Sequence, residues 1–162
     1  MASVFFLLGA NLGNRREQLA EAERQLERQI GPLLRKSRLY ESEAWGTTDQ
    51  PAYYNQVLYH QTALLPEVIL TTALAIEARM GRVRQQKWEA RQIDIDVLYY
   101  DQWVYESARL SLPHPLIALR RFALMPLAEV APDFVHPVLG QTQTQLLEQC
   151  PDILPVQALP SC

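Results

Sequence analysis

The chain has 162 residues, of which 48% are hydrophobic and 20% charged, and its formal net charge is −3. These values are typical of a globular protein with one core, and the acidic balance argues against nucleic acid as a partner. No apolar run approaches the ~20 residues of a membrane span, and the start "MASVFFLLGANLGN" lacks the basic segment of a signal peptide. Both cysteines, Cys150 and Cys162, lie near the C-terminus, which indicates no disulfide framework. We therefore expect a single domain over residues 1–162, without membrane contact, in the reducing cytoplasm. A monomer is also expected, although no pattern in the sequence determines the oligomeric state.

The first part of the chain alternates between strand and helix patterns. "VFFLLGA" (4–10) predicts a buried strand that ends at a glycine turn. Asn14 and Glu17 have the spacing of a capping box at a helix start. The apolar stripe of this helix consists of Leu19, Ala22, Leu26 and Ile30. A strand near 34–41 and an alternating strand at 54–64 follow, separated by a polar loop.

The second part begins with another helix, which Pro66 opens at a favoured first-turn position and Gly81 closes. Its core face consists of Ile69, Ala73, Ile76 and Met80. In the basic stretch 82–91, apolar residues follow neither the helical nor the strand spacing. We expect this stretch to be a long loop that leads into a strand. A short strand at 103–105 and a short helix near 119–129 come next.

The expected order of elements is β-α-β-β-α-β, which is typical of an α+β, ferredoxin-like α-β-α sandwich with a mostly antiparallel sheet. A doubly wound parallel sheet is less favoured, because only two long helices precede the fourth strand. We place the core of the domain at about 3–137, and the tail at 138–162 has no pattern that we interpret.

The strand "IDIDVLYY" carries two aspartates among apolar residues. Side chains alternate across a strand, so Asp94 and Asp96 share one face and the isoleucines take the other. Two neighbouring carboxylates repel each other unless a positive charge lies close by. A D-x-D pair on a strand can hold Mg²⁺ together with phosphate oxygens. By itself the motif is a weak signal, because such pairs are more often two solvent-facing aspartates.

The context of the pair favours a nucleotide site. A basic stretch precedes the strand and contains Arg82, Arg84, Lys87 and Arg91. Carboxylate-bound metal beside guanidinium groups is what a nucleoside triphosphate requires. The sequence has no P-loop, no G-x-G-x-x-G motif at a helix start and no Cys/His cluster for zinc.

Three further residues suit a flat heterocycle. Trp45, Tyr53 and Asn55 lie near the start of the third strand, where aromatic rings and an amide match such a ligand. Ordinary aromatic packing is the alternative. His114, between two prolines, is by itself best interpreted as a histidine bonded to the backbone of a rigid turn.

Four segments together resemble the 6-hydroxymethyl-7,8-dihydropterin pyrophosphokinase family. They are "LGANLGN", "SRLYESEAWGTTDQPAYYNQV", "IEARMGRVRQQKWEARQIDIDVLYYD" and "LPHPLIALRRFALMPLAEVAPDFVHP". They run from residue 7 to 137 in the family's order, and the combination of R-x-I-D-x-D with P-H-P-x-x-x-x-R-x-F is specific. The resemblance implies a ferredoxin-like core and transfer of pyrophosphate from ATP to the pterin hydroxymethyl group, with AMP as by-product, in folate biosynthesis.

The resemblance also implies roles for individual residues. Asp94 and Asp96 would bind two Mg²⁺ ions, and with Arg82 and Arg91 they would form the catalytic group. The residues that match family positions around ATP are Glu77, Arg84, Trp88, Arg109, His114 and Arg120. The residues that match the pterin pocket are Ser42, Glu43, Ala44, Trp45, Tyr53, Asn55 and Phe122.

One departure from the family pattern concerns the loop: the usual W-G-P-R is "WEAR" here, so glycine and proline constraints before Arg91 are missing. Two alternative functions share the same scaffold. A metal-dependent nucleotidyltransferase would explain the aspartates and arginines but not the pterin-like pocket. A non-catalytic module would bind nucleotide or metal without turnover.

Overall fold

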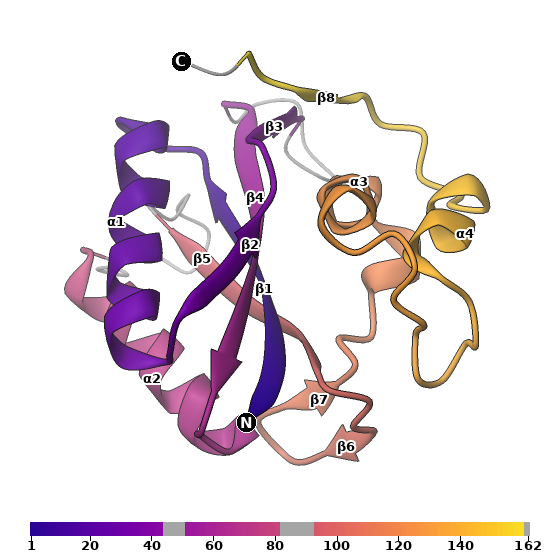
Figure 1. The fold of residues 1–162 in the computed structure, drawn as a ribbon. Helices are drawn as coiled ribbons and strands as arrows, with labels where there is room; N and C mark the ends of the chain where they lie inside the picture. The colour runs from indigo at the N-terminus through magenta and orange to yellow at the C-terminus, as the bar shows by residue number, and fades with distance from the viewer. Residues whose placement is uncertain (44–50, 82–92, 161–162) are drawn as a thin grey trace.

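A six-stranded antiparallel sheet with helices on both faces forms the centre of the structure (Figure 1). The structure is a computed structural model that describes residues 1–43, 51–81 and 93–160. In chain order the strands of this sheet are β1 (Ala2–Ala10), β2 (Leu33–Lys36), β3 (Tyr40–Ser42), β4 (Tyr53–Thr62), β5 (Asp94–Tyr100) and β8 (Val156–Ala158). Their spatial order is β5-β1-β4-β3-β8, and β2 also pairs with β4.

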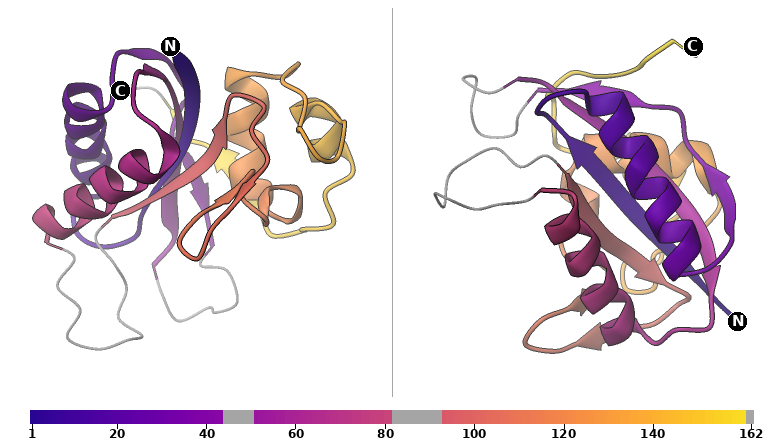
Figure 2. Two further views of the ribbon diagram at one scale, coloured as in Figure 1. Left: turned by 90° about the horizontal axis from the view of Figure 1, so that it is seen from below. Right: turned by 90° about the vertical axis from the view of Figure 1, so that its left-hand side faces the viewer.

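The helices form one layer on each side of the sheet (Figures 1 and 2). One layer consists of α1 (Arg15–Gln29) and α2 (Pro66–Arg79). The other consists of the 3-10 turn η1 (Ile117–Leu119), α3 (Arg121–Val130) and α4 (Gln143–Glu148). A small hairpin, β6 (Tyr105–Glu106) and β7 (Ser111–Leu112), connects β5 to this second layer. The predicted ferredoxin-like α-β-α sandwich is confirmed.

The predicted helix starts are also confirmed. The Asn14 side chain accepts a hydrogen bond of 3.1 Å from the Glu17 N–H, which satisfies one free donor of the first turn. Pro66 is the first residue of α2, where its missing N–H costs nothing. The predicted first strand ends at Ala10, as expected, and the chain then turns at Gly13 with φ 61°.

Alternation along β1 divides the apolar residues between two cores. Phe6 and Leu8 pack with the core residues of α1 and α2, whereas Phe5 and Leu7 pack with those of α3 and α4. All four side chains are buried, so β1 is covered on both faces. The two helical layers therefore meet the same central strand from opposite sides.

Two predictions about strands were incomplete. The strand expected near 34–41 is divided into β2 and β3, because Ser37 interrupts the ladder: its Oγ accepts a hydrogen bond of 3.0 Å from the Val57 N–H. The strand expected at 103–105 lies at the later position of β6. Helix α3 follows the predicted helix closely, and η1 precedes it.

The tail at 138–162 contains two elements that the sequence did not predict. Helix α4 begins with a capping box in which Thr142 and Gln145 exchange side-chain to backbone hydrogen bonds. Strand β8 adds to the edge of the sheet beside β3. Among the helices of the described ranges, none is long and apolar enough to span a membrane. The cytoplasmic location and the monomeric state stay predictions.

Candidate functional site

The two aspartates lie on the face of the sheet that α3 covers in part. Ile93, Ile95 and Val97 belong to the core under α1 and α2. Because side chains alternate along β5, Asp94 and Asp96 point to the other face, where both are partly exposed. The predicted separation of acidic and apolar residues along this strand is confirmed.

A glycine separates the acidic strand from the expected pterin residues. Gly9 of β1 pairs with Asp94 on one side and with Asn55 on the other. Strands lie ~4.8 Å apart, so the Cα atoms of Asp94 and Asn55 are about 10 Å apart. A Cβ at Gly9 would lie 3.3 Å from the Asn55 Oδ1 and 3.7 Å from the Tyr53 ring. The glycine therefore leaves the floor between the aspartate and the amide open.

The amide of Asn55 is held by a neighbouring strand. Its Nδ2 donates a hydrogen bond of 2.8 Å to the Ser42 Oγ, and both side chains are buried. Ser42 pairs with Tyr53 across the ladder between β3 and β4, so the three side chains lie on one face. Glu43 follows Ser42 and is exposed. The structure thus brings together three of the residues predicted to bind the pterin, Ser42, Tyr53 and Asn55.

Arg120 and Phe122 approach the same face from the start of α3. The Arg120 Cζ lies 5.5 Å from the centroid of the Phe122 ring. Burial lowers the pKa of the Arg120 guanidinium, and the negative charge of Asp96 acts in the opposite direction. A half-buried cation therefore lies within the field of the acidic pair.

His114 is held in a neutral form next to this group. Burial, and secondarily the charge of Arg120, lowers its pKa to about 4. Its Nδ1 accepts a hydrogen bond of 3.1 Å from the Leu116 N–H, so the neutral ring carries its proton on Nε2. Its backbone N–H donates to the Leu98 carbonyl at 2.9 Å, which joins the turn to β5. The ring can therefore donate a hydrogen bond to an anionic oxygen.

Glu77 reaches the acidic strand from the opposite layer. Its side chain is 3% exposed, and its carboxylate accepts a hydrogen bond of 2.6 Å from the Ile95 N–H, between the two aspartates. Arg109, on the hairpin connection, is exposed and donates a hydrogen bond of 3.0 Å to the Thr71 Oγ1 of α2. Their assignments to ATP binding stay predictions.

Six predicted site residues lie outside the described residues: Ala44, Trp45, Arg82, Arg84, Trp88 and Arg91. One residue of the candidate site, Gly9, was not singled out from the sequence, although a glycine inside a strand pattern is typical of a close approach to its surface.

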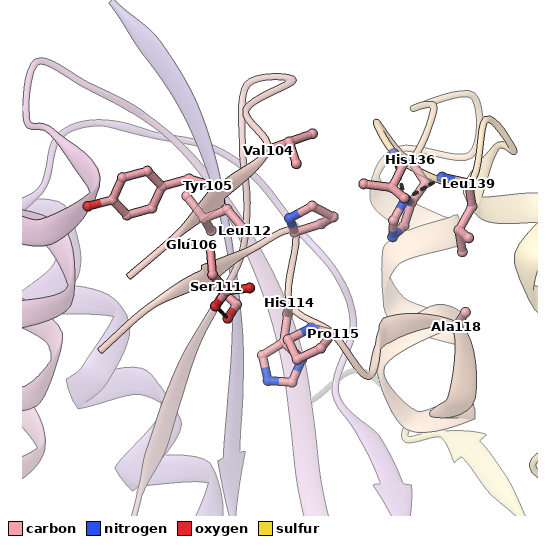
Figure 3. Close-up of a pocket in the computed structure, with 12 residues that line it drawn as sticks. Val104, Tyr105, Glu106, Ser111, Leu112, His114, Pro115, Ala118, His136 and Leu139 are labelled. Atoms are coloured by element: carbon pink, nitrogen blue, oxygen red, sulfur yellow. Dashed lines mark hydrogen bonds between the residues drawn. The ribbon is translucent and has the colours of Figure 1, made fainter. Parts of the chain in front are cut away.

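A cleft of about 370 Å³ lies beyond His114, between the β6–β7 hairpin and the turn around His136 (Figure 3). The His136 Nδ1 accepts hydrogen bonds from the N–H groups of Val138 and Leu139, which occupies that nitrogen. Glu106 contributes a negative charge on the opposite wall. The cleft is therefore a poor place for a triphosphate compared with the sheet face.

The donor atoms suit a metal that is shared with a ligand. In the described part of the chain, no group of three or more His, Cys, Asp or Glu side chains can hold a metal ion. Asp94 and Asp96 supply carboxylate oxygens on one face. Mg²⁺ commonly binds one or two carboxylates and completes its shell with water and phosphate oxygens. The pair therefore fits Mg²⁺ in the presence of a nucleotide.

Curated relatives share much of the sequence. The chain is 41% identical over 152 residues to a 2-amino-4-hydroxy-6-hydroxymethyldihydropteridine pyrophosphokinase of Synechocystis, covering 92% of this chain and 77% of the relative. It is 38% identical over 138 residues to the enzyme of that name from Aquifex aeolicus, covering 85% of this chain and 86% of the relative.

Solved structures share the fold. The HPPK-DHPS of Plasmodium falciparum, solved with pteroate, has a TM-score of 0.74 at 16% identity, covering 91% of this chain. This chain spans 42% of that longer chain.

The family comparison agrees with the arrangement of the site. The family described as 7,8-dihydro-6-hydroxymethylpterin-pyrophosphokinase (HPPK) matches residues 5–132. This range includes the acidic strand, the amide of Asn55 and the start of α3. The chain therefore belongs to the 7,8-dihydro-6-hydroxymethylpterin-pyrophosphokinase family, the ATP-dependent pyrophosphokinases of folate biosynthesis.

Proposed function

We propose that the pyrophosphokinase reaction of this chain takes place on the sheet face between β5 and β3, with Asp94 and Asp96 as ligands of two Mg²⁺ ions. As a member of its family, the chain transfers pyrophosphate from ATP to 6-hydroxymethyl-7,8-dihydropterin. The pterin hydroxyl oxygen bonds to the β-phosphorus of ATP and its proton passes to water, the bond from that phosphorus to the α-phosphate oxygen breaks, and AMP leaves with that oxygen. The single observation that carries the proposal is the row Asp94–Gly9–Asn55 across three strands.

The acidic end of this row is assigned to the triphosphate. Bound Mg²⁺ would neutralise phosphate charge and polarise the β-phosphorus. Arg120, in the field of Asp96, supplies a fixed positive charge beside the same oxygens. His114 acts as a neutral donor from Nε2, because a ring whose pKa is about 4 is too weak a base to take the hydroxyl proton efficiently near pH 7. Arg82 and Arg91 are proposed to add charge from the preceding segment.

The other end of the row is assigned to the pterin. The Asn55 amide, oriented by Ser42, offers a carbonyl oxygen to the donor edge of the ring. Tyr53 and Phe122 offer aromatic surface on either side. The distance of about 10 Å between the Cα atoms of Asp94 and Asn55 leaves room for the substrate between the acidic and amide groups.

A product assay tests the proposal. The protein is incubated with ATP, Mg²⁺ and the pterin alcohol, and the products are separated with and without EDTA. We expect AMP and the pterin diphosphate in equal amounts, and neither product with EDTA. Pyrophosphate with a nucleotidyl adduct would indicate the nucleotidyltransferase, and binding without turnover would indicate the non-catalytic module.

A further inference from the structure

The C-terminal segment Asp152–Ala158 joins two parts of the proposed pterin pocket. After α4 the chain runs past α3 to the β3 edge of the sheet (Figure 1). At its start it contacts the first turn of α3, and at its end it forms β8. This segment lies in the tail, outside the matched family range of residues 5–132.

Asp152 completes the start of α3. The residue before the helix, Arg120, makes no side-chain cap, so the N–H groups of the first turn need another acceptor. The Asp152 Oδ2 accepts a hydrogen bond of 3.1 Å from the Arg121 N–H, and its backbone oxygen accepts one of 3.0 Å from the Arg121 Nε. A carboxylate is favoured there by the positive end of the helix dipole.

The carboxylate is itself fixed by the tail. The Asp152 Oδ1 accepts a hydrogen bond of 3.0 Å from the Leu154 N–H, which orients the side chain toward the helix. Beyond it, Val156 pairs with Ser42, and the Leu159 N–H donates to the Leu39 carbonyl at 2.8 Å. Ser42 orients the Asn55 amide. One short segment therefore connects the helix start to the strand that holds the pterin amide.

The contact between Asp152 and Arg121 affects Arg120 and Phe122 differently. Arg120 has additional anchors, because its N–H donates to the Ile117 carbonyl at 3.2 Å and its charge lies in the field of Asp96. Phe122 is the second residue of the helix, so its position depends on the geometry of the first turn. Loss of the cap is therefore expected to move the aromatic ring more than the guanidinium.

We infer that Asp152 is a positioning residue for the pterin pocket, which fixes the first turn of α3 and with it the ring of Phe122. The inference rests on the proposed placement of the pterin. The far end of α3 is held separately, since Glu129 accepts a hydrogen bond of 2.5 Å from the Tyr40 hydroxyl and pairs with Arg38 at 3.3 Å. The helix stays docked when the cap is removed, and only its start is released.

The test compares Asp152→Ala with Asp152→Asn in the full chain. For Asp152→Ala we expect the KM for the pterin to rise about tenfold, as the loss of a helix cap permits, while the KM for ATP changes less than twofold. Asp152→Asn retains an acceptor oxygen and should return the pterin KM to within twofold of the unmodified protein. Asp152→Glu only displaces the carboxylate and should give a KM for the pterin between those of the alanine and asparagine variants. It replaces the alanine variant in the test if that variant does not fold.

Two controls separate positioning from general stability. Ile153→Ala changes a neighbouring side chain that is 89% exposed and should alter neither KM. Glu129→Gln weakens the far end of α3 and should lower the melting temperature without raising the pterin KM. Equal changes in both KM values, an unchanged pterin KM in Asp152→Ala, or no rescue by asparagine would overturn the inference. Absence of the pterin diphosphate with the unmodified protein would instead refute the proposed function.

Discussion

The two faces of the sheet are built differently. The face under α1 and α2 is closed: Phe6 and Leu8 of β1 are both 0% exposed there, and the His60 ring of β4 is buried against Phe6. The face under α3 and α4 is apolar only in its middle, and its end carries Asp94, Asp96 and Arg120. Groups of this kind are costly to bury, and half-covered placement lets water and ligands compensate them. The comparison teaches that one face is closed and supplies stability, while the other leaves charged groups accessible at the end where we propose the reaction.

Among the substitutions considered, Asp96→Asn is expected to have the largest effect on kcat. Loss of one negative charge should reduce kcat about a thousandfold, which corresponds to ~4 kcal/mol of lost transition-state stabilisation. Folding should change little, because the variant loses both the repulsion from Asp94 and the attraction to Arg120. Steady-state rates and thermal melting, each with and without Mg²⁺, measure the two quantities.

Asp133→Asn is the matched control for this change, since Asp133 is an exposed aspartate that lies outside the proposed site. It should leave kcat and the response to Mg²⁺ unchanged. A fully active Asp96→Asn variant would contradict the assignment of β5 to the metal.

A substitution under α1 and α2 should have the opposite effect: it should lower stability and leave kcat unchanged. Leu26→Ala in α1 removes a side chain that is 0% exposed and should lower the free energy of unfolding by about 3 kcal/mol. The kcat of the remaining folded protein should not change. Urea unfolding and rate measurements at low temperature test this, with Leu74→Ala, 43% exposed on α2, as the control. A fall in kcat comparable to that of Asp96→Asn would mean that the two faces are not independent.

A smaller effect is expected where β1 forms the floor of the site. Gly9→Ala places a Cβ 3.3 Å from the Asn55 Oδ1, which is tighter than an ordinary contact. Displacement of the amide should raise the KM for the pterin about fivefold, or ~1 kcal/mol, and leave the KM for ATP nearly unchanged. Initial rates with each substrate varied give both constants. A change confined to the KM for ATP would disagree with the placement of the pterin beside Asn55.

The smallest effect concerns pH and involves one histidine from each face. Burial lowers the pKa of His60, which packs against Phe6, and lowers that of His114 to about 4. The unfolded chain binds these protons near pH 6.5 while the folded chain does not, so the free energy of unfolding should fall as pH decreases below ~6.5. Both histidines should contribute to this loss in the same direction, and the loss should be present at pH 5.

Urea unfolding between pH 7 and 5 measures this dependence. His60→Gln and His114→Gln should each reduce its slope, because glutamine takes up no proton. A stability that does not change over this range would show that neither histidine resists protonation.

Local signals in the sequence account for much of what could be predicted. The alternation of Asp94 and Asp96 with isoleucines defined the polar face of β5, and Asn14 and Pro66 marked helix starts. These signals act within a few residues, where sequence spacing determines geometry.

Contacts between distant residues could not be predicted in this way. Nothing near Asp152 indicates that it meets the start of α3, and β8 is three residues long, too short for an alternating pattern. Arg120 and Arg121 are neighbours with the same chemistry, and only the fold distinguishes them: one lies beside Asp96 and the other contacts the tail.

The hydrogen bond between Glu77 and the Ile95 N–H has a consequence for self-association. β5 is the outermost strand on its side of the sheet, and unpaired N–H groups on such a strand invite a strand from another molecule. The carboxylate of Glu77 already occupies the donor in the middle of the acidic stretch. An incoming strand would have to displace this buried side chain, so the proposed active end of the sheet is protected from edge-to-edge aggregation.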